Sequence, residues 1–157
     1  MSIEDDIAVI ERVPTLRALG REALRILAIG AESRFVRKGD VLFTAGETAD
    51  CGYVIQDGSF RLDGLSRALG EVVVGPGALL GELALIAETK RPATATANDE
   101  STVIRISRSL FLKMLEGYPR AAHILREQIA ARAALALNEM SDLRAMFDTS
   151  RAPPPAG

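Results

Sequence analysis

Two charged side chains in the segment GELALIAETKRPATATA, which runs from Gly81 to Ala97, could do chemistry together. Arg91 carries a guanidinium, which is always protonated and can donate two parallel N–H bonds to two oxygens of a phosphate. Glu82 carries a carboxylate, which can accept a hydrogen bond from a hydroxyl group. Gly81 allows the backbone a positive φ or a close approach to another molecule. Taken singly these are ordinary surface features, so their interpretation depends on the combination and on the rest of the chain.

The segment resembles the phosphate-binding cassette of cyclic-nucleotide-binding domains. The matching residues are Gly81, Glu82, Leu83, Ala84 and Leu85, followed by Arg91, Ala93 and Thr94 at the family's usual distance. In that family the cassette is a short helix between two strands, and it wraps the ribose and cyclic phosphate of cAMP or cGMP. The resemblance implies that Arg91 binds the phosphate and that Glu82 accepts a hydrogen bond from the ribose 2′-hydroxyl. It also implies that the amides of Leu83 and Ala84 open the short helix toward the anion.

Pro92 departs from the family's pattern, because relatives usually carry Ala, Ser or Thr at this position. In the family the backbone N–H of that residue also binds the phosphate, and proline has no N–H. A hydrogen bond to a charged group contributes roughly 1.5 to 3 kcal/mol. We therefore expect an affinity lower by about one to two decades, unless the amide of Ala93 or a water substitutes. Relatives selective for cGMP often use Thr here, so the sequence favours cAMP, with cGMP as the alternative ligand.

The upstream sequence from Gly39 to Gly58 resembles the first half of the family's β-roll. Gly39, Gly46 and Gly58 lie between short runs of β-branched and aromatic residues, which is typical of tight turns between strands. The resemblance covers about residues 14–147. It implies a mainly β fold with flanking helices (α+β), in which a double-stranded β-helix, a jelly-roll-like β-roll, carries N-terminal helices and a long C-terminal helix.

Local patterns predict where these elements lie, with the roll over about 30–108 and the C-terminal helices over about 109–147. We expect a buried strand at 72–74, a turn at Pro76-Gly77 and a last strand at 102–106. Helices are expected over 22–29, from a cap at Ser109 to Gly117, and from Pro119 to about Phe147. The resemblance implies that the pocket is lined by Val74, Leu80 and Thr94, with Arg126 and Arg132 of the last helix as candidates for contact with the base.

The last helix carries an apolar seam. Its members are spaced four and three alternately: Ile129, Ala133, Ala136, Met140, Leu143 and Phe147. The seam could pack on the chain's own roll, but a helix of roughly 40 Å outruns what a small roll can cover. By resemblance to the catabolite activator branch, where this helix both dimerises and covers the base, we expect a homodimer.

Composition limits the classes of function. The chain has 157 residues, 48% of them apolar, which predicts one domain over 1–150 and a flexible Pro-rich tail over 151–157. Without a run of about twenty apolar residues or a signal-like N-terminus, we expect no membrane span and a cytoplasmic location. Nineteen basic and twenty-one acidic residues are mixed along the chain, which argues against nucleic-acid binding. The activator branch adds a DNA-binding domain after the long helix, so this sequence is a stand-alone sensor or a fragment.

Cysteine and histidine are too few for most metal chemistry. Cys51 is the only cysteine and His123 the only histidine, so one chain offers no disulfide, four-cysteine cluster or zinc site. A metal-dependent enzyme on a similar roll would need several histidines or carboxylates, and a haem ligated by His123 is a remote alternative. We therefore expect no metal, no cofactor and no catalysis.

Two interpretations stay open. The first is a cyclic-nucleotide sensor, and the second is an interaction module that kept the fold and lost the ligand. Pro92 and the apolar face from Ala130 to Leu137 favour the second. Nothing in the sequence indicates the downstream protein partner.

Overall fold

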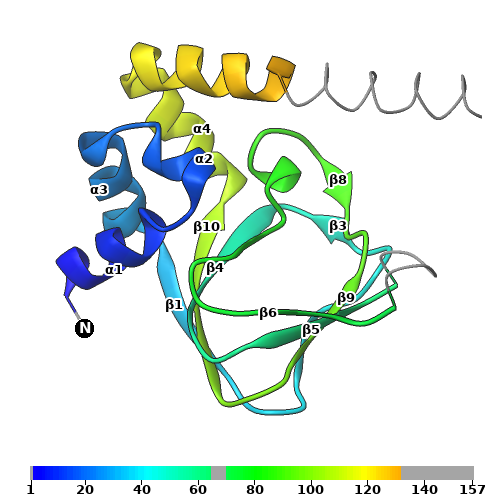
Figure 1. The fold of residues 1–157 in the computed structure, drawn as a ribbon. Helices are drawn as coiled ribbons and strands as arrows, with labels where there is room; N and C mark the ends of the chain where they lie inside the picture. Colours follow the sequence, from blue (N-terminus) through cyan, green and yellow to red (C-terminus); the bar gives the residue numbers. More distant parts are fainter. Residues whose placement is uncertain (1, 65–69, 132–157) are drawn as a thin grey trace, which may run out of the picture.

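Three short helices precede the strands in the computed structural model, which describes residues 2–64 and 70–131. They are α1 (Ile3–Ile10), α2 (Pro14–Arg17) and α3 (Arg21–Gly30), and they pack beside the roll in Figure 1. Helix α1 begins with a capping box, in which Ser2 and Asp5 each bond the backbone N–H of the other. The sequence analysis did not predict α1 or α2, although the Ser2-x-x-Asp5 spacing before two isoleucines is a recognisable start signal.

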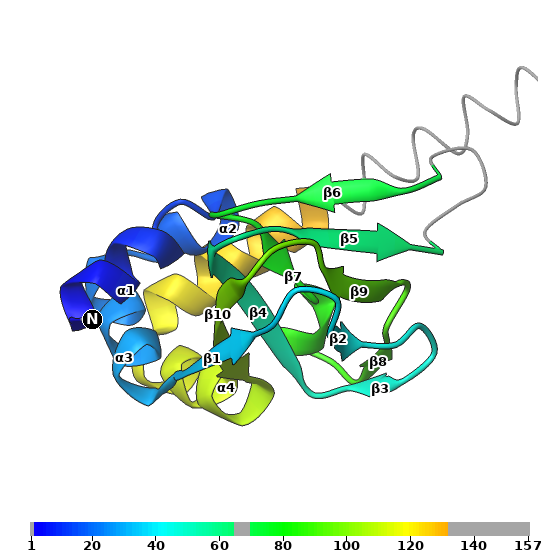
Figure 2. The same ribbon diagram turned by 90° about the horizontal axis from the view of Figure 1, so that it is seen from below.

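The strands form two four-stranded sheets and a two-stranded ribbon, and every pairing is antiparallel. The first sheet has the order β1 (Glu32–Val36), β10 (Ser101–Ser107), β4 (Cys51–Asp57) and β7 (Leu79–Leu80). The second has the order β2 (Val41–Phe43), β9 (Thr94–Ala97), β5 (Phe60–Asp63) and β6 (Val72–Val74), and the ribbon pairs β3 (Thr48–Ala49) with β8 (Thr89–Lys90). Seen from below in Figure 2, β5 and β6 extend away from the helices. The predicted mainly β fold with flanking helices is confirmed.

Strand β4 separates two apolar cores. Because side chains alternate across a strand, Tyr53 and Ile55 point into the roll, where they pack with Phe60 and Val103. Val54 points the other way, into a cluster made mainly by the helices. The interior of the roll is therefore a compartment of its own, walled on one side by β4.

Helix α4 (Arg108–Gly117) follows β10 directly and leads into a further helical stretch at 119–131. Its N-cap is Ser107, whose Oγ accepts a 3.1 Å hydrogen bond from the amide of Leu110. The predicted cap at Ser109 is therefore wrong by two residues, because the extended Ser107 sits where the helix needs an acceptor. The predicted continuation of the last helix to Phe147 lies outside the described residues.

Strand β6 is present where predicted but is not buried. Val73 is 57% exposed, because β6 is an edge strand of its sheet and only one of its faces meets the roll. Residue type cannot predict which of three consecutive valines faces the solvent. The predicted strand at 102–106 is present as the core of β10.

Glycines make the turns that the sequence suggested. Gly39, Gly46 and Gly58 have φ of +91°, +89° and +86°, a region that other residues rarely adopt. At Gly58 space is also short, since an added Cβ would lie 2.6 Å from the carbonyl oxygen of Glu100 and against Oγ of Ser101. At Gly39 nothing lies within 4 Å of such a Cβ.

These two glycines give a test of the packing. Changing either to alanine should cost about 1 to 2 kcal/mol of unfolding free energy through backbone strain. Gly58→Ala should cost roughly 1 to 3 kcal/mol more, because the methyl group overpacks the turn against Ser101. Urea denaturation of both variants measures the difference, and equal losses would contradict the described packing.

Candidate anion-binding site

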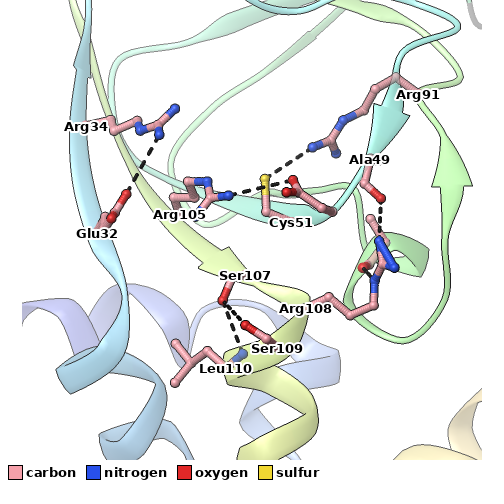
Figure 3. Close-up of polar contacts among 12 residues, drawn as sticks. Glu32, Arg34, Ala49, Cys51, Arg91, Arg105, Ser107, Arg108, Ser109 and Leu110 are labelled. Atoms are coloured by element: carbon pink, nitrogen blue, oxygen red, sulfur yellow. Dashed lines mark hydrogen bonds and ion pairs between the residues drawn. The ribbon is translucent and has the colours of Figure 1, made fainter.

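Arg91 places a guanidinium inside the roll. The residue is only 6% exposed, and its Nη2 donates a hydrogen bond to Sγ of Cys51 at 3.3 Å, as Figure 3 shows. The central carbon of the guanidinium lies 4.4 Å from the ring centroid of Phe43 and 5.5 Å from that of Tyr53. Such cation–π contacts offset part of the cost of burying a positive charge.

No group near Arg91 balances its charge in the part of the chain that the structure describes. No carboxylate there lies within 4.0 Å of the guanidinium, and the buried Nη1 has no hydrogen-bond partner. Burial, with a smaller effect of Cys51, raises the pKa of Tyr53, so the phenol stays neutral and does not act as a counter-ion at neutral pH. A buried charge is normally paired. The buried guanidinium is therefore a candidate for binding an anion.

The backbone of Arg91 is fixed to the neighbouring loop. Its amide donates to the carbonyl of Glu47 at 2.8 Å, and its carbonyl accepts from the amide of Gly46 at 2.9 Å. Thr94, predicted as pocket lining, accepts a 2.9 Å bond from the amide of Ala45 through its Oγ1. These contacts set where the guanidinium enters the roll.

Gly81 lies against the guanidinium, so the structure brings together two of the residues that the sequence singled out. Its φ is +83°, and a Cβ at this position would meet Nη1 of Arg91 and lie 3.1 Å from the carbonyl oxygen of Cys51. The positive φ expected for Gly81 is present. The close approach that the structure shows is to Arg91, whereas the expected approach to another molecule stays a prediction.

Glu82 is placed differently from Arg91. Its Oε1 accepts a 3.1 Å hydrogen bond from Oγ1 of Thr15 in helix α2. Both residues line an apolar cavity of about 240 Å³ between α2, the 3₁₀ helix η1 (Leu83–Leu85), α4 and the 119–131 helix. Arg91 does not line this cavity, so we place the candidate anion site at the guanidinium and not here.

The other cassette residues differ in their burial and in the use of their backbone amides. Ala84 is buried in η1, and its amide donates to the carbonyl of Gly81 at 3.1 Å. That amide is therefore used inside the 3₁₀ turn, contrary to the expectation that it points at the anion. Leu83 is 62% exposed, Pro92 is exposed and Ala93 is buried.

Two predicted pocket residues face the roll and another does not approach it. Leu80 is buried with Tyr53 in the roll core, and Val74 packs against the same cluster. Arg126 is exposed and lines a groove between η1, α4 and the 119–131 helix, to which Arg91 does not contribute. Arg132 lies outside the described residues.

The sequence analysis missed the side chains that surround the guanidinium. It gives no role at the site to Cys51, Phe43 or Tyr53. Alternation along β4 places Cys51 and Tyr53 on one face, which could have shown that they enter the same interior. Their contact with Arg91 depends on the folding of the cassette onto β4.

A profile of the cyclic nucleotide-binding domain family matches residues 33–118. The chain belongs to this family. The matched stretch begins in β1 and ends just after α4, so it includes every residue described around the buried guanidinium. The family suggested by the residues of the cassette is therefore confirmed.

Individual relatives agree with the family. The chain is 27% identical over 124 residues to the cyclic AMP receptor protein of Thermus thermophilus, which covers 76% of this chain and 56% of that protein. A solved cyclic nucleotide-binding-like protein from Brucella abortus is 46% identical, with a TM-score of 0.63, covering 71% of this chain and 98% of the other. The N-terminal domain of a Streptomyces coelicolor transcriptional regulator is 31% identical, with a TM-score of 0.75, covering 84% and 94%. The chain thus spans about half the length of the Thermus receptor.

Within residues 2–64 and 70–131, no helix combines the length and the apolar character needed to cross a membrane.

Replacing Arg91 by an uncharged residue tests whether the protein itself compensates the buried positive charge. Arg91→Met keeps a long side chain but removes the cation and the unsatisfied Nη1, which offsets the lost cation–π and packing contacts. We expect the free energy of unfolding to stay within about 1 kcal/mol of wild type or to rise. The measurement is urea denaturation in a buffer free of phosphate and nucleotide.

Ile55→Val, which shortens a fully buried side chain of the same roll core, is the reference and should cost about 0.5 to 1.5 kcal/mol. A loss of roughly 3 kcal/mol or more in Arg91→Met would mean that the charge already has a strong internal partner.

Proposed function

We propose that this chain is a non-enzymatic sensor that binds a cyclic nucleotide through the guanidinium of Arg91, with cAMP as the first candidate ligand and cGMP as the second. One observation carries the proposal: Arg91 is buried, has no carboxylate within 4.0 Å among the described residues, and keeps Nη1 without a partner. A cyclic phosphate supplies one negative charge and two free oxygens, which suit a guanidinium. Membership of the family supports this choice of anion.

The ribose 2′-hydroxyl would be recognised by the carboxylate of Glu82, which already accepts a hydrogen bond from Thr15 of α2. A carboxylate has about four acceptor positions, so it can accept from the hydroxyl and keep that contact. We infer that binding of the ribose moves Glu82, and with it η1, relative to α2. Movement of η1 would then reach the 119–131 helix, since Leu85, Leu125 and Ile129 belong to one apolar cluster.

Assembly and location are part of the proposal. We propose a cytoplasmic homodimer through the C-terminal helix, by similarity to the receptor branch. Ile129, the only described member of the predicted seam, packs against the chain's own core. The other members of the predicted seam lie outside the described residues, so the dimer stays a prediction.

The alternative function is an interaction module that keeps the fold without the ligand. The missing N–H at Pro92 favours it. Both interpretations retain the fold and differ in whether a cyclic nucleotide binds at Arg91. The same titration therefore decides between them.

Calorimetric titration with cAMP and with cGMP, on wild type and on Arg91→Met, tests the sensor. Wild type should bind one of them, and the variant should lose roughly 2 to 5 kcal/mol of binding free energy, which is about 30-fold or more in affinity. In thermal denaturation, a ligand at a hundred times its Kd should add about 2.7 kcal/mol to the stability of wild type. Equal affinity in the two proteins would refute the role of Arg91, and no binding of either nucleotide to wild type would favour the interaction module.

Restoring the missing amide should strengthen binding. Pro92 is exposed, so Pro92→Ala adds a backbone N–H beside Arg91 with little change in packing. If the amide reaches the phosphate, affinity for the nucleotide should rise by about one to two decades. Pro76→Ala, at another exposed proline in the turn before β7 and sixteen residues before Pro92, is the matched control and should leave the affinity unchanged. A decrease in affinity in Pro92→Ala would show instead that proline serves by fixing the backbone.

A further inference from the structure

Arg108, the first residue of α4, joins both walls of the anion site to that helix (Figure 3). Its Nη2 donates to the carbonyl of Ala49 at 2.7 Å, and its Nε donates to the carbonyl of Ala84 at 3.0 Å. Its backbone amide donates to the carbonyl of Asp50 at 2.8 Å. One residue thus contacts η1 on one side and the β3–β4 connection on the other.

The two carbonyls belong to segments that touch Arg91 directly. Ala84 follows Gly81 in the cassette, and Gly81 lies against the guanidinium. Ala49 precedes Cys51, whose Sγ accepts the bond from Arg91. Ala49 and Ala84 are each 1% exposed, so water cannot easily replace Arg108 at their carbonyls.

The chemistry of this contact requires arginine. Nε–H and one Nη–H of a guanidinium point along the same edge in a rigid fork, so they can hold two acceptors at a fixed separation. A lysine carries the same positive charge on a single nitrogen, so it cannot reproduce that geometry. Both acceptors are neutral carbonyls, so Arg108 supplies positioning without an ion pair.

We propose that Arg108 is a positioning residue that fixes the spacing between η1 and β4 around the anion site, and that it transmits occupancy of the site to α4. The second part rests on the proposed function. Any ligand that shifts η1 relative to β4 must either break one of the two bonds or carry the start of α4 with it. Sequence analysis gave Arg108 no role.

The first arm of the test uses the ligand-free protein. Arg108→Met removes both donors and should speed hydrogen exchange at the amides of Ala84 and Leu85 by about tenfold, which is about 1.4 kcal/mol of local stability. Arg108→Lys should give an intermediate rate and covers the case in which Arg108→Met does not fold. Lys113→Met, at an exposed position of the same helix, should leave these amides unchanged. Exchange at wild-type rates in both Arg108 variants would overturn the positioning role.

The second arm adds saturating cAMP, or cGMP if that is the ligand found. In wild type and Lys113→Met the nucleotide should change the exchange rates of both η1 and α4. In the Arg108 variants it should still protect η1, with about tenfold weaker binding, and should no longer alter α4. A response of α4 equal to that of wild type would overturn transmission through Arg108.

Failure of the proposed function would look different. In that case wild type itself would bind neither nucleotide. The positioning role would still be decided by the exchange rates of Ala84 and Leu85 measured without nucleotide.

Discussion

The positive charge of Arg91 inside the β-roll is the constraint on which the site depends. Moving an ammonium- or guanidinium-sized ion out of water costs several kcal/mol even after relaxation. The two aromatic rings and the weak N–H···S contact with Cys51 return only part of that cost, since a cation–π contact contributes about 0.5 to 2 kcal/mol. Among the described residues, the charge of Arg91 is therefore only partly compensated, and binding of an anion would satisfy it.

The rest of the fold offsets the cost of burying that charge. Strand β4 separates the roll interior from the helical core, so the roll need not supply the whole stability of the domain. Two backbone hydrogen bonds hold Arg91 to Gly46 and Glu47. They fix the point at which its side chain enters the roll. Gly81 lies on the side of Nη1, the nitrogen without a hydrogen-bond partner, and a side chain at this position would occupy the space next to that donor.

Sequence reasoning predicted what local rules determine, and missed what depends on distant contacts. The roll was predicted from the resemblance of the cassette and of the segment 39–58 to the family, and the positive-φ glycines follow from turns whose residues lie close together. The contact between Arg91 and Cys51 joins residues brought together only by the tertiary fold, and so does that between Glu82 and Thr15. Two predictions were wrong for smaller reasons. The helix cap lies at Ser107 and not at Ser109, a shift of two residues between two serines. Val73 is exposed because β6 forms a sheet edge, which residue type does not encode.

The two polar groups of the cassette differ in their surroundings, and under the proposed function they would have different roles. Arg91 has a buried donor without a hydrogen-bond partner, so pairing it with a phosphate adds a bond to a charged group. Glu82 is held by a 3.1 Å hydrogen bond from Thr15, so its carboxylate is positioned before a ribose 2′-hydroxyl binds. Affinity would come mainly from the phosphate, which every cyclic nucleotide carries. Glu82 would act mainly in discrimination, because a 2′-deoxy ligand lacks the hydroxyl from which its carboxylate can accept a bond.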